Sequence, residues 1–476
     1  MFLYGFLFMI DTMEEKKING TLLVISFVYL SVLSLFANAT GHISIALLLA
    51  PLLFFLIKFD AFNFIVVYFS CNLFFFEPHK SSVFFNVLNA TVSLQIADVF
   101  LIIFLAGYFF SKKNLSSFTF PRSGLLFTFY LFIAYVLIMA INPLLAKGGD
   151  LWLVYDIKIF LVFALAAFFC TQPLYTPKKI IYIFFAVILF VDLYALIVIG
   201  EFLFTRERQI TWNEIYFSNM TIVSMVLFTA IRNKFCKVML AVAIFISVLG
   251  ILASQTRSIW ISTFLCSMAY LVYFFIRKLK NIDAGKITKF VIIMALSFLA
   301  VEIIMRVFLK TDLLYYLIKR MTITDNTELI NPFSSLGYRI YESTSVWLKR
   351  SFWGHGTGAY LYLFQTQMGR MKFLYWQSIH CEYMEILHKW GFFGLGLYFI
   401  FIVTYLFQSF KLFISKKRFV SLLGAIAFFT FFNTLIISLT SGYMFRVNML
   451  MWVNLMIGVI VNYRTRLLKN KQRRHS

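Results

Sequence analysis

The sequence has little charge, little proline or glycine, and few cysteines. Asp, Glu, Lys and Arg make up 13% of its 476 residues, whereas a soluble domain has about 25%. A soluble globular enzyme is excluded, because a folded chain of this length has to cover its surface with polar groups. The 7 prolines, 21 glycines and 5 cysteines exclude a low-complexity disordered chain, a collagen-like chain and a disulfide scaffold as well.

Apolar residues dominate instead. They make up 61% of the chain, which contains 61 phenylalanines and has a mean hydropathy of +0.86. About fourteen runs approach the roughly 20 apolar residues that a transmembrane helix needs. Several are short or closely abutted, so we predict an all-α polytopic integral membrane protein with about 12–14 transmembrane helices. The runs span residues 21–37, 43–57, 61–76, 92–110, 124–142, 152–171, 180–204, 215–232, 238–253, 257–276, 288–309, 391–413, 419–440 and 443–462.

Basic residues fall mainly on alternate connections between these spans. More than half of the 43 lysines and arginines, in a chain of formal net charge +23, lie on one side, which identifies that side as the cytoplasm. Both ends of the chain then lie inside. The basic tail is a topology anchor that contacts anionic lipid, and no nucleic-acid partner is expected. Among the predicted cytoplasmic residues are Lys112, Lys113, Arg232, Lys234, Lys237, Lys411, Lys416, Lys417 and Arg418.

The predicted domain organisation follows from the spans and the connections. The opening MFLYGFLFMI is too short to span and lacks a basic leading region, so it is interfacial or Met13 is the true start. The single long outward connection is predicted to be folded, because long structureless loops are uncommon in compact domains. The segments are a cytoplasmic or interfacial N-terminus (1–20), a membrane domain with the first eleven helices (21–309), an extracytoplasmic catalytic loop (310–390), the last three transmembrane helices (391–462) and a basic cytoplasmic tail (463–476).

No metal or other cofactor is expected. The six histidines are scattered and no Cys/His spacing is that of a zinc site. The outer loop also lacks an Asp-x-Asp pair that would hold a divalent ion on a diphosphate. We therefore expect any phosphate on the outer side to be bound by arginine, whose planar guanidinium group can grip two phosphate oxygens.

The first outward motif is SQTRSIW, at residues 254–260, in which Arg257 opens a predicted span. Ser254 and Thr256 can cap that helix, and the free N–H groups of a helix N-terminus favour an anion there. An arginine at the N-terminus of a helix can form a phosphate-binding site. The alternative is a membrane anchor whose charged head reaches the interface.

The second motif is LGYRIYESTSVWLKRSFWGHGTGAY, at residues 336–360. Arg339 precedes an amphipathic stretch that ends in a glycine-rich turn, and the aromatic residues suit a membrane interface or stacking on sugar rings. The alternative for Arg339 is an ion pair with Glu342 three residues later. The glycines follow no predicted strand, so a dinucleotide-binding loop is not expected.

The third motif is HCEYMEILHKWGFFG, at residues 380–394, in which His380 begins a predicted helix that passes through Gly391 into a span. A histidine at the rim of a membrane cavity can take a proton from a sugar hydroxyl near neutral pH. The alternative is a structural histidine bonded within the loop. His388, with Glu385 and Lys389 nearby, is predicted to lie on a solvated helical face.

These segments together resemble the shared region of O-antigen ligases and O-antigen polymerases. The resemblance covers residues 240–410 and implies a GT-C-like membrane fold with two outward arginines and one histidine as the functional set. By motif these are the diphosphate-binding Arg257 and Arg339, and His380, all three with a catalytic role. One departure is Cys381, because Asn, Ser or Gln usually follows this histidine in ligases. The motifs are S-Q-T-R-S at 254–258, R-I-Y-E-S at 339–343, G-H-G-T-G-A-Y at 354–360 and H-x(10)-G-x-x-G at 380–394, and the supporting residues are Tyr338, Glu342, Gly356, Tyr360 and Glu382.

The resemblance implies metal-independent inverting glycosyl transfer on the outer face of the bacterial inner membrane. The donor is a glycan linked to polyprenyl diphosphate, and the acceptor is a sugar hydroxyl of another glycan or of a lipid A core. Without a metal, fixed cations have to stabilise the departing diphosphate, and His380 orients or deprotonates the acceptor. The further partners are the lipid bilayer, a chain-length regulator and a flippase.

Three functions stay open at this point. The first is an O-antigen or exopolysaccharide polymerase, which Cys381 and the extra spans favour. The second is an O-antigen ligase that transfers the glycan to a lipid A core. The third is a flippase or transporter of lipid-linked oligosaccharides, which should show internal repeats and charged groups at the midplane of the membrane. The sequence concentrates its features in one outer loop instead.

Overall fold

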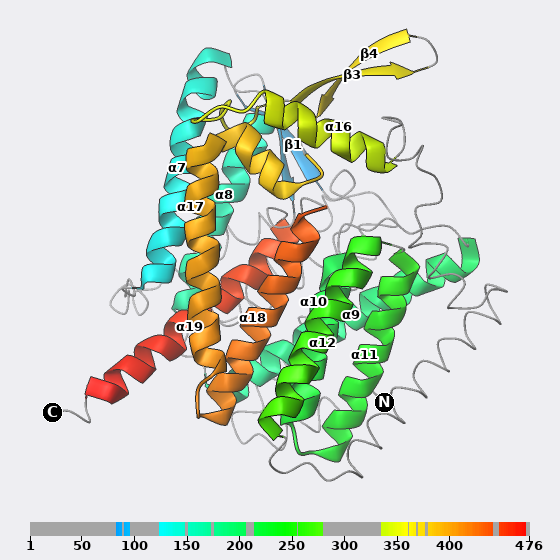
Figure 1. The fold of residues 1–476 in the computed structure, drawn as a ribbon, viewed down its shortest axis with the longest axis vertical. Coiled ribbons are helices and arrows are strands. Elements are labelled where there is room, and N and C mark those ends of the chain that lie inside the picture. The colour runs from blue at the N-terminus through cyan, green and yellow to red at the C-terminus, as the bar shows by residue number, and fades with distance from the viewer. Residues whose placement is uncertain are drawn as a thin grey trace. The chain divides into compact units, whose positions relative to one another are not determined.

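The computed structural model describes residues 82–87, 90–95, 123–147, 151–172, 176–205, 214–254, 256–278, 335–359, 361–367, 370–376, 379–440 and 447–472 (Figure 1). Apart from residues 92–95, the predicted spans before residue 123 lie outside the described residues, as do the span 288–309 and the stretch 310–334. The elements are β1 (Ser82–Val87), β2 (Ala90–Gln95), α7 (Gly124–Lys147), α8 (Leu151–Thr171), α9 (Pro177–Thr205), α10 (Glu214–Ala230), α11 (Lys234–Ser254), α12 (Arg257–Lys278), α16 (Ser335–Leu348), β3 (Leu361–Gln367), β4 (Arg370–Trp376), α17 (Glu382–Phe413), α18 (Arg418–Ser438) and α19 (Val447–Gln472).

The predicted helical membrane fold is confirmed. Each predicted span from residue 124 onward that falls on described residues coincides with a helix, because in lipid a helix satisfies its backbone hydrogen bonds within the segment. The predicted span 92–110 is wrong at its start, because residues 92–95 belong to the strand β2. Five described helices are long and apolar enough to cross a membrane, and α10 and the middle of α12 are shorter apolar helices. The five candidate spans are Gly124–Ile141, Ile183–Phe204, Lys234–Ser254, Glu382–Phe413 and Arg418–Ser438.

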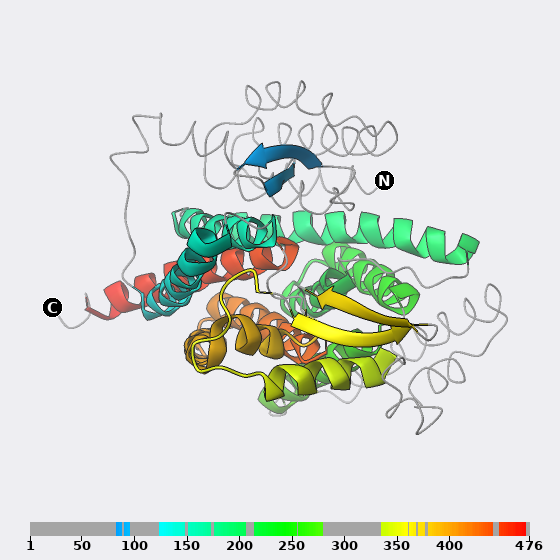
Figure 2. The same cartoon turned by 90° about the horizontal axis from the view of Figure 1, so that it is seen from above.

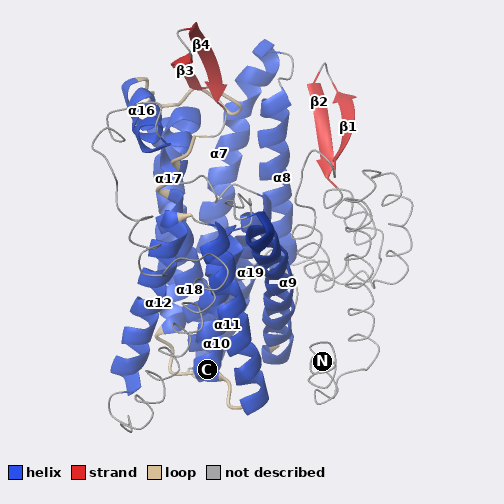
Figure 3. Ribbon diagram, turned by 90° about the vertical axis from the view of Figure 1, so that its right-hand side faces the viewer, coloured by secondary structure: helices blue, strands red, loops and turns tan. Residues whose placement is uncertain are grey.

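Two β-hairpins interrupt the helices, and neither was predicted (Figure 3). β1 pairs antiparallel with β2, from Ser82 opposite Gln95 to Val87 opposite Ala90. β3 pairs antiparallel with β4 within the predicted catalytic loop, and this hairpin lies beside α16 (Figure 2). Strands as short as these are easily missed, because a short apolar run has the same composition in a buried helix and in a strand.

The described chain divides into two compact units, with the boundary inside α9. One unit is Met1–Phe190 with Val447–Ser476, and the other is Val191–Arg446. In the first unit α7, α8 and α19 pack together. A Cβ atom at Gly458 of α19 would lie 2.0 Å from the carbonyl oxygen of Cys170 in α8, so only glycine lets these two backbones approach so closely.

In the second unit α18 packs against α10, α12 and α17. A network of neutral polar side chains joins α18, α10 and α12. The amide Nδ2 of Asn433 donates to Ser218 Oγ at 2.7 Å and to Asn219 Oδ1 at 2.9 Å, and Ser218 Oγ lies 2.5 Å from Thr263 Oγ1. All four residues are buried. Such bonds stabilise helix association in lipid, where apolar burial contributes little.

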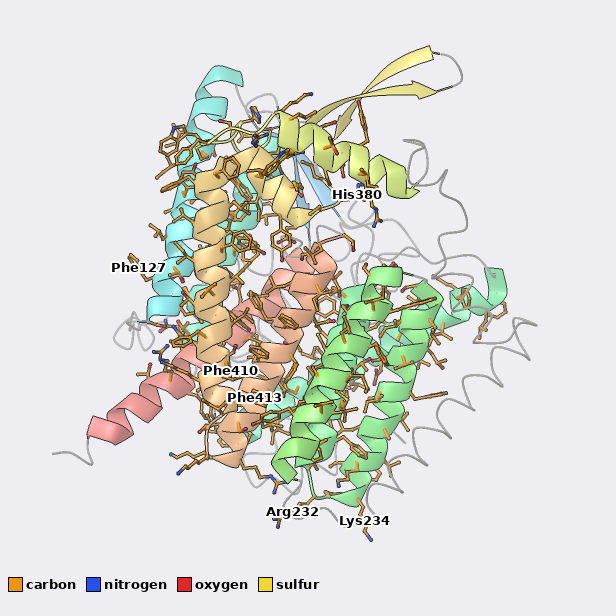
Figure 4. The ribbon with its side chains drawn as sticks, in the orientation of Figure 1. Phe127, Arg232, Lys234, His380, Phe410 and Phe413 are labelled. Carbon is orange, nitrogen blue, oxygen red and sulfur yellow. The ribbon has the colours of Figure 1, made fainter. Side chains whose placement is uncertain are left out.

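The second unit has a basic end and an end that carries His380. Figure 4 shows Arg232 and Lys234 at one end and His380 at the other. The guanidinium of Arg418, at the start of α18, donates to the carbonyl oxygen of Ala230 at 2.6 Å, which brings the connection between α17 and α18 to the basic end. The two predicted cytoplasmic connections therefore lie together, away from His380. The side of the membrane itself stays a prediction.

Candidate active site

The helix predicted to begin at the third motif exists, but it is broken in the middle. α17 runs from Glu382 to Phe413, and inside it Gly391 adopts φ 66° and ψ −168°. Figure 1 shows the first turns of α17 running across the top of the longer second part. The sequence predicted a helix passing through Gly391, and it did not predict the break. A positive φ of this kind is readily adopted only by glycine.

A loop from residue 352 to residue 359 fills the break in α17. In a continuous helix the Phe393 N–H would donate to the carbonyl of Lys389. Here Phe393 N donates to Phe352 O at 3.2 Å, and Lys389 O accepts from Gly356 N at 2.9 Å. His355 N similarly donates to His388 O at 3.0 Å. The predicted glycine-rich turn therefore supplies hydrogen bonds at the point where α17 is broken.

The fit between loop and helix leaves no room for a side chain at two glycines. A Cβ at Gly391 would lie 2.2 Å from Phe352 O and 2.4 Å from Gly354 N, and one at Gly354 would lie 2.4 Å from Lys389 O. Gly354, Gly356 and Gly358 all have positive φ. Gly356, one of the predicted supporting residues, therefore acts through its backbone.

We expect Gly391→Ala to destabilise the protein by about 3 kcal/mol or more, because the new methyl group meets backbone atoms in a strained conformation. Thermal unfolding of the purified protein in detergent measures the effect. Gly396→Ala is the matched control on the same helix, where a Cβ meets nothing within 4 Å, and it is expected to be neutral or to stabilise by up to about 1 kcal/mol. Equal unfolding temperatures for the two variants would contradict this account of the break.

The solvated helical face predicted at residues 385–389 is wrong. His388 is 5% exposed and Lys389 is 4% exposed, because the loop that fills the break covers them. The ring of His355 lies over that of His388 with centroids 4.8 Å apart. Lys389 Nζ donates to Glu385 Oε1 at 2.8 Å, so the buried ammonium group has its counter-ion one turn away.

His380 is held by a buried carboxylate. Its backbone N–H donates to Glu342 Oε2 at 2.9 Å, and its ring Nδ1 lies 3.1 Å from the same oxygen. The Glu342 side chain is fully buried, whereas that of His380 is 36% exposed. Because a carboxylate oxygen can only accept a hydrogen bond, the ring donates to it from Nδ1. Glu342 lies in the same predicted loop, so this contact also fits the alternative of a structural histidine bonded within the loop.

An apolar cluster sets the distance between Glu342 and His380. Val346, one turn after Glu342 on α16, packs with Leu361, Ile379 and Leu387, all at most 2% exposed. Residues four apart lie on one face of a helix, so burying Val346 turns the Glu342 side of α16 towards α17. Ile379 immediately precedes His380. The cluster thus joins the residues on either side of His380 to α16 and to Leu361, the first residue of β3.

A second buried carboxylate belongs to Glu382, the first residue of α17. Glu382 is fully buried and accepts from Tyr398 Oη at 2.7 Å and from Ser438 Oγ at 3.0 Å. Tyr398 follows the break at Gly391 and Ser438 ends α18. These bonds connect the short first part of α17, which begins two residues after His380, to the longer second part of the same helix and to α18. Glu382 was predicted as a supporting residue, and these contacts are consistent with such a role.

Cys381 is the N-cap residue of α17. Its side chain makes no capping hydrogen bond, whereas its carbonyl accepts from Met384 N at 3.1 Å and Glu385 N at 3.0 Å. Burial raises the pKa of the thiol; the nearby backbone N–H groups oppose the rise and the two neighbouring glutamates add to it. The group next to His380 is therefore a neutral thiol, a weak donor where the related pattern has an amide or hydroxyl.

Arg257 is the first residue of α12, as the first motif predicted. α11 begins at Lys234, at the basic end, and ends at Ser254, so α12 starts at the end of the second unit where His380 lies. Thr256, before this helix, donates to the buried carboxylate of Glu214 at the start of α10. The side chain of Arg257 lies outside the described part of the structure.

The other arginine, Arg339, lies in α16 one turn before Glu342 and its side chain is half-buried. One side of α16 thus carries both an arginine and the carboxylate that holds His380. The side chain of Tyr338 and the whole of Tyr360 lie outside the described residues. Within the described chain, no three His, Cys, Asp or Glu side chains form a group that could hold a metal ion.

Residues 242–399 match the family model described as O-antigen ligase. The match contains Arg257, Arg339, Glu342, His380 and the break in α17. This segment is similar to the O-antigen ligase family. The recognition of an O-antigen ligase or polymerase family from the motifs is thereby confirmed. No curated protein matches the chain. The family implies a glycosyltransferase-type activity in a bacterial inner membrane, with a lipid-linked glycan as donor.

Sequence reasoning missed some polar residues that the O-antigen ligase segment uses or contacts. Glu214 lies 42 residues before Thr256, and Tyr398 and Ser438 lie 16 and 56 residues after Glu382. None belongs to a motif. The available signal was a polar residue within an apolar run, because in lipid such a residue is usually bonded to another helix or functional. That signal marks a residue without naming its partner.

Proposed function

We propose that the protein performs metal-independent inverting glycosyl transfer on the outer face of the bacterial inner membrane, from a polyprenyl-diphosphate-linked glycan to a sugar hydroxyl. The observation that carries the proposal is the pairing of His380 with the buried carboxylate of Glu342, inside the segment that matches the O-antigen ligase family. The pair presents a His380 side chain that is 36% exposed beside a fully buried carboxylate.

His380 acts on the acceptor in this proposal. Its Nε2 accepts the proton of the acceptor hydroxyl while that oxygen attacks the anomeric carbon of the donor sugar. The bond between the anomeric carbon and the diphosphate oxygen breaks on the opposite face of the ring, so the configuration inverts. The Glu342 carboxylate keeps Nδ1 protonated and stabilises the imidazolium that forms, which is the role of the acid in other carboxylate–histidine pairs.

Arg257 and Arg339 act on the leaving group. Negative charge develops on the diphosphate as the sugar departs, and an arginine placed beforehand stabilises this charge more than the ground state. Arg257 also stands at the N-terminus of α12, where free backbone N–H groups favour an anion. Tyr338, Gly356, Tyr360 and Glu382 support the site, Gly356 and Glu382 through the contacts described above.

We propose the polymerase reaction, in which the acceptor is a sugar of a second glycan unit and the product is O-antigen or exopolysaccharide. Cys381 supports this choice, because its neutral thiol replaces the amide or hydroxyl usual in ligases. The ligase reaction, with a lipid A core as acceptor, is the second candidate because the matching family model is described as O-antigen ligase. A chain-length regulator and a flippase are the further partners that a polymerase needs.

The outer face is supported by the charge distribution. In the second unit the basic connections that include Arg232, Lys234 and Arg418 lie together at the end away from His380. Basic connections are retained in the cytoplasm. Both termini are then cytoplasmic, and His380 faces outward.

Transfer by the purified protein with a defined lipid-linked donor and two alternative acceptors tests the proposal. We expect product with a second lipid-linked glycan, little product with a lipid A core, and full activity in excess chelator, since the arginines replace a metal. Product with the lipid A core alone would establish the ligase reaction instead. An absolute requirement for a divalent ion would contradict the role of the arginines.

A further inference from the structure

A short segment at the end of α16 and directly after it exposes large apolar side chains together with two cations. Its sequence is WLKRSFW, from Trp347 to Trp353. Trp347 is 46% exposed, Leu348 75%, Phe352 56% and Trp353 58%. Lys349 and Arg350, between them, are also exposed. We refer to these six residues as the WLKR-FW tip. A soluble protein rarely exposes a contiguous apolar patch of this kind unless it binds something.

The apolar side chains of the WLKR-FW tip are held by α17. The ring of Trp347 lies 6.2 Å from that of Phe392, and the ring of Trp353 lies 5.5 Å from that of Phe393. Both phenylalanines directly follow the break at Gly391. The loop that fills this break therefore also places the tip. The exposed surface is thus presented by a fixed backbone.

The same contacts make the tip continuous with the exposed apolar face of α17. Phe392 and Phe393 are 39% and 40% exposed, and the exposed apolar residues continue along the helix with Phe399, Ile400, Val403 and Phe407. Their spacing of three and four residues marks one face of the helix. In a membrane-spanning helix that face meets lipid. The tip lies at the end of this face that is farther from the basic connections.

Two exposed cations stand among the apolar residues. The guanidinium carbon of Arg350 lies 4.5 Å from the centre of the Trp347 ring, and its Nη1 donates to the carbonyl of Trp347 at 2.7 Å. Lys349 immediately precedes it. Tryptophan together with lysine or arginine is typical of the membrane interface, where rings lie at the headgroup level and cations meet phosphates.

We propose that the WLKR-FW tip inserts into the outer leaflet of the bilayer, with its four apolar side chains below the headgroups and Lys349 and Arg350 at the lipid phosphates. The continuity with the exposed face of α17 selects lipid as the partner over a second protein. The tip is joined through α16 to Glu342 and through the filled break to the helix that follows His380. It therefore sets the depth of the site in the membrane.

The consequence for transfer rests on the proposed function. The diphosphate of a polyprenyl-linked donor lies at the level of the lipid phosphates, since its tail stays in the hydrocarbon. A tip anchored at that level keeps the site where this diphosphate arrives. Donors with a membrane-embedded tail depend on the tip in this account, whereas short-chain donors free in water do not.

Fluorescence quenching in reconstituted vesicles measures the insertion directly. The full-length protein is placed in phosphatidylcholine brominated either near the headgroup or near the bilayer centre. We expect shallow bromines to quench Trp347 and Trp353, so Trp347→Phe and Trp353→Phe each remove quenched emission. Trp452→Phe is the matched control, because Trp452 is 1% exposed and its emission should resist both lipids. Quenching of the two tip tryptophans by aqueous acrylamide alone, or by neither reagent as in a protein–protein contact, would overturn the proposal.

A kinetic comparison tests the consequence. We expect Trp353→Ser to raise the KM for a long-chain lipid-linked donor by roughly tenfold with little change in kcat, and Trp353→Leu, which keeps the apolar character, to change it little. Neither should alter the KM of a short-chain, water-soluble donor. If Trp353→Ser and Trp353→Leu raised the KM for the long-chain donor equally, membrane insertion would not be the cause of the change. If wild-type protein transferred no glycan, the proposed function would fail while the quenching result still decided the insertion.

Discussion

Replacing His380 by alanine is expected to lower the rate of glycan transfer by about 100- to 10,000-fold, the contribution typical of a general base. Membrane expression and thermal stability should change little, because the His380 ring is partly exposed and its backbone N–H, which alanine keeps, also bonds to Glu342. The rate constant under saturating donor and acceptor measures the effect. His355→Ala is the matched control, since His355 is an exposed histidine of the adjacent loop, and it should transfer within a few-fold of wild type.

The variant Glu342→Gln distinguishes two roles of Glu342: holding His380 in position and supplying a negative charge to its ring. Glutamine can still accept from the His380 backbone through its amide oxygen, but it brings no negative charge to the imidazolium. We expect a loss of at least about 10-fold and up to about 10,000-fold, the range between a carboxylate that orients a ligand histidine and one that stabilises a catalytic imidazolium. Full activity of His380→Ala would remove the histidine from catalysis. Full activity of Glu342→Gln would leave Glu342 a structural role only.

Replacing Arg257 or Arg339 by alanine is expected to lower the rate of transfer by about 100- to 1,000-fold, the usual cost of removing one donor to a developing oxyanion. Lysine should restore little, because an ammonium group lacks the planar fork that grips two phosphate oxygens. Turnover with a lipid-linked donor, measured beside membrane expression, decides the point. Arg232→Ala is the control, because Arg232 is an exposed arginine at the opposite end of the unit.

The arginine prediction also depends on where the three residues lie. Cysteines introduced singly at positions 257, 339 and 380 should react with a membrane-impermeant reagent added from outside. Labelling from the cytoplasmic side alone would contradict the outward site. Full rescue by Arg339→Lys would show that a point charge is sufficient and that the bidentate grip is not needed.

The sequence by itself determined the class of fold and the family that residues 242–399 resemble. Runs of about 20 apolar residues have few alternatives in lipid, where every backbone group has to be bonded within its own segment. This is why the predicted spans from residue 124 onward coincide with helices wherever their residues are described. The motifs around Arg257, Arg339 and His380 are local in sequence, so they were recognisable without coordinates, and the helix starts at Arg257 and just after His380 follow from the same local signals.

Only the tertiary structure decided which groups meet. Glu342 lies 38 residues before His380, and the sequence offered an equally good local partner in Arg339. The break at Gly391 looked like a continuous helix, because the loop that supplies the missing hydrogen bonds comes about 35 residues earlier in the chain and no helical periodicity records it. His388 and Lys389 were for the same reason expected in solvent and are buried.

The physical reason is the range of the interactions. Apolar periodicity and capping act within a turn or two of one helix, and they are visible in a short window of sequence. A buried carboxylate or a strained glycine is tolerated only when distant segments satisfy it. Glu342 and Gly391 are such positions, and the segments that satisfy them also carry the histidine and the membrane-facing tip. Folding therefore assembles the site from parts that the sequence shows only separately.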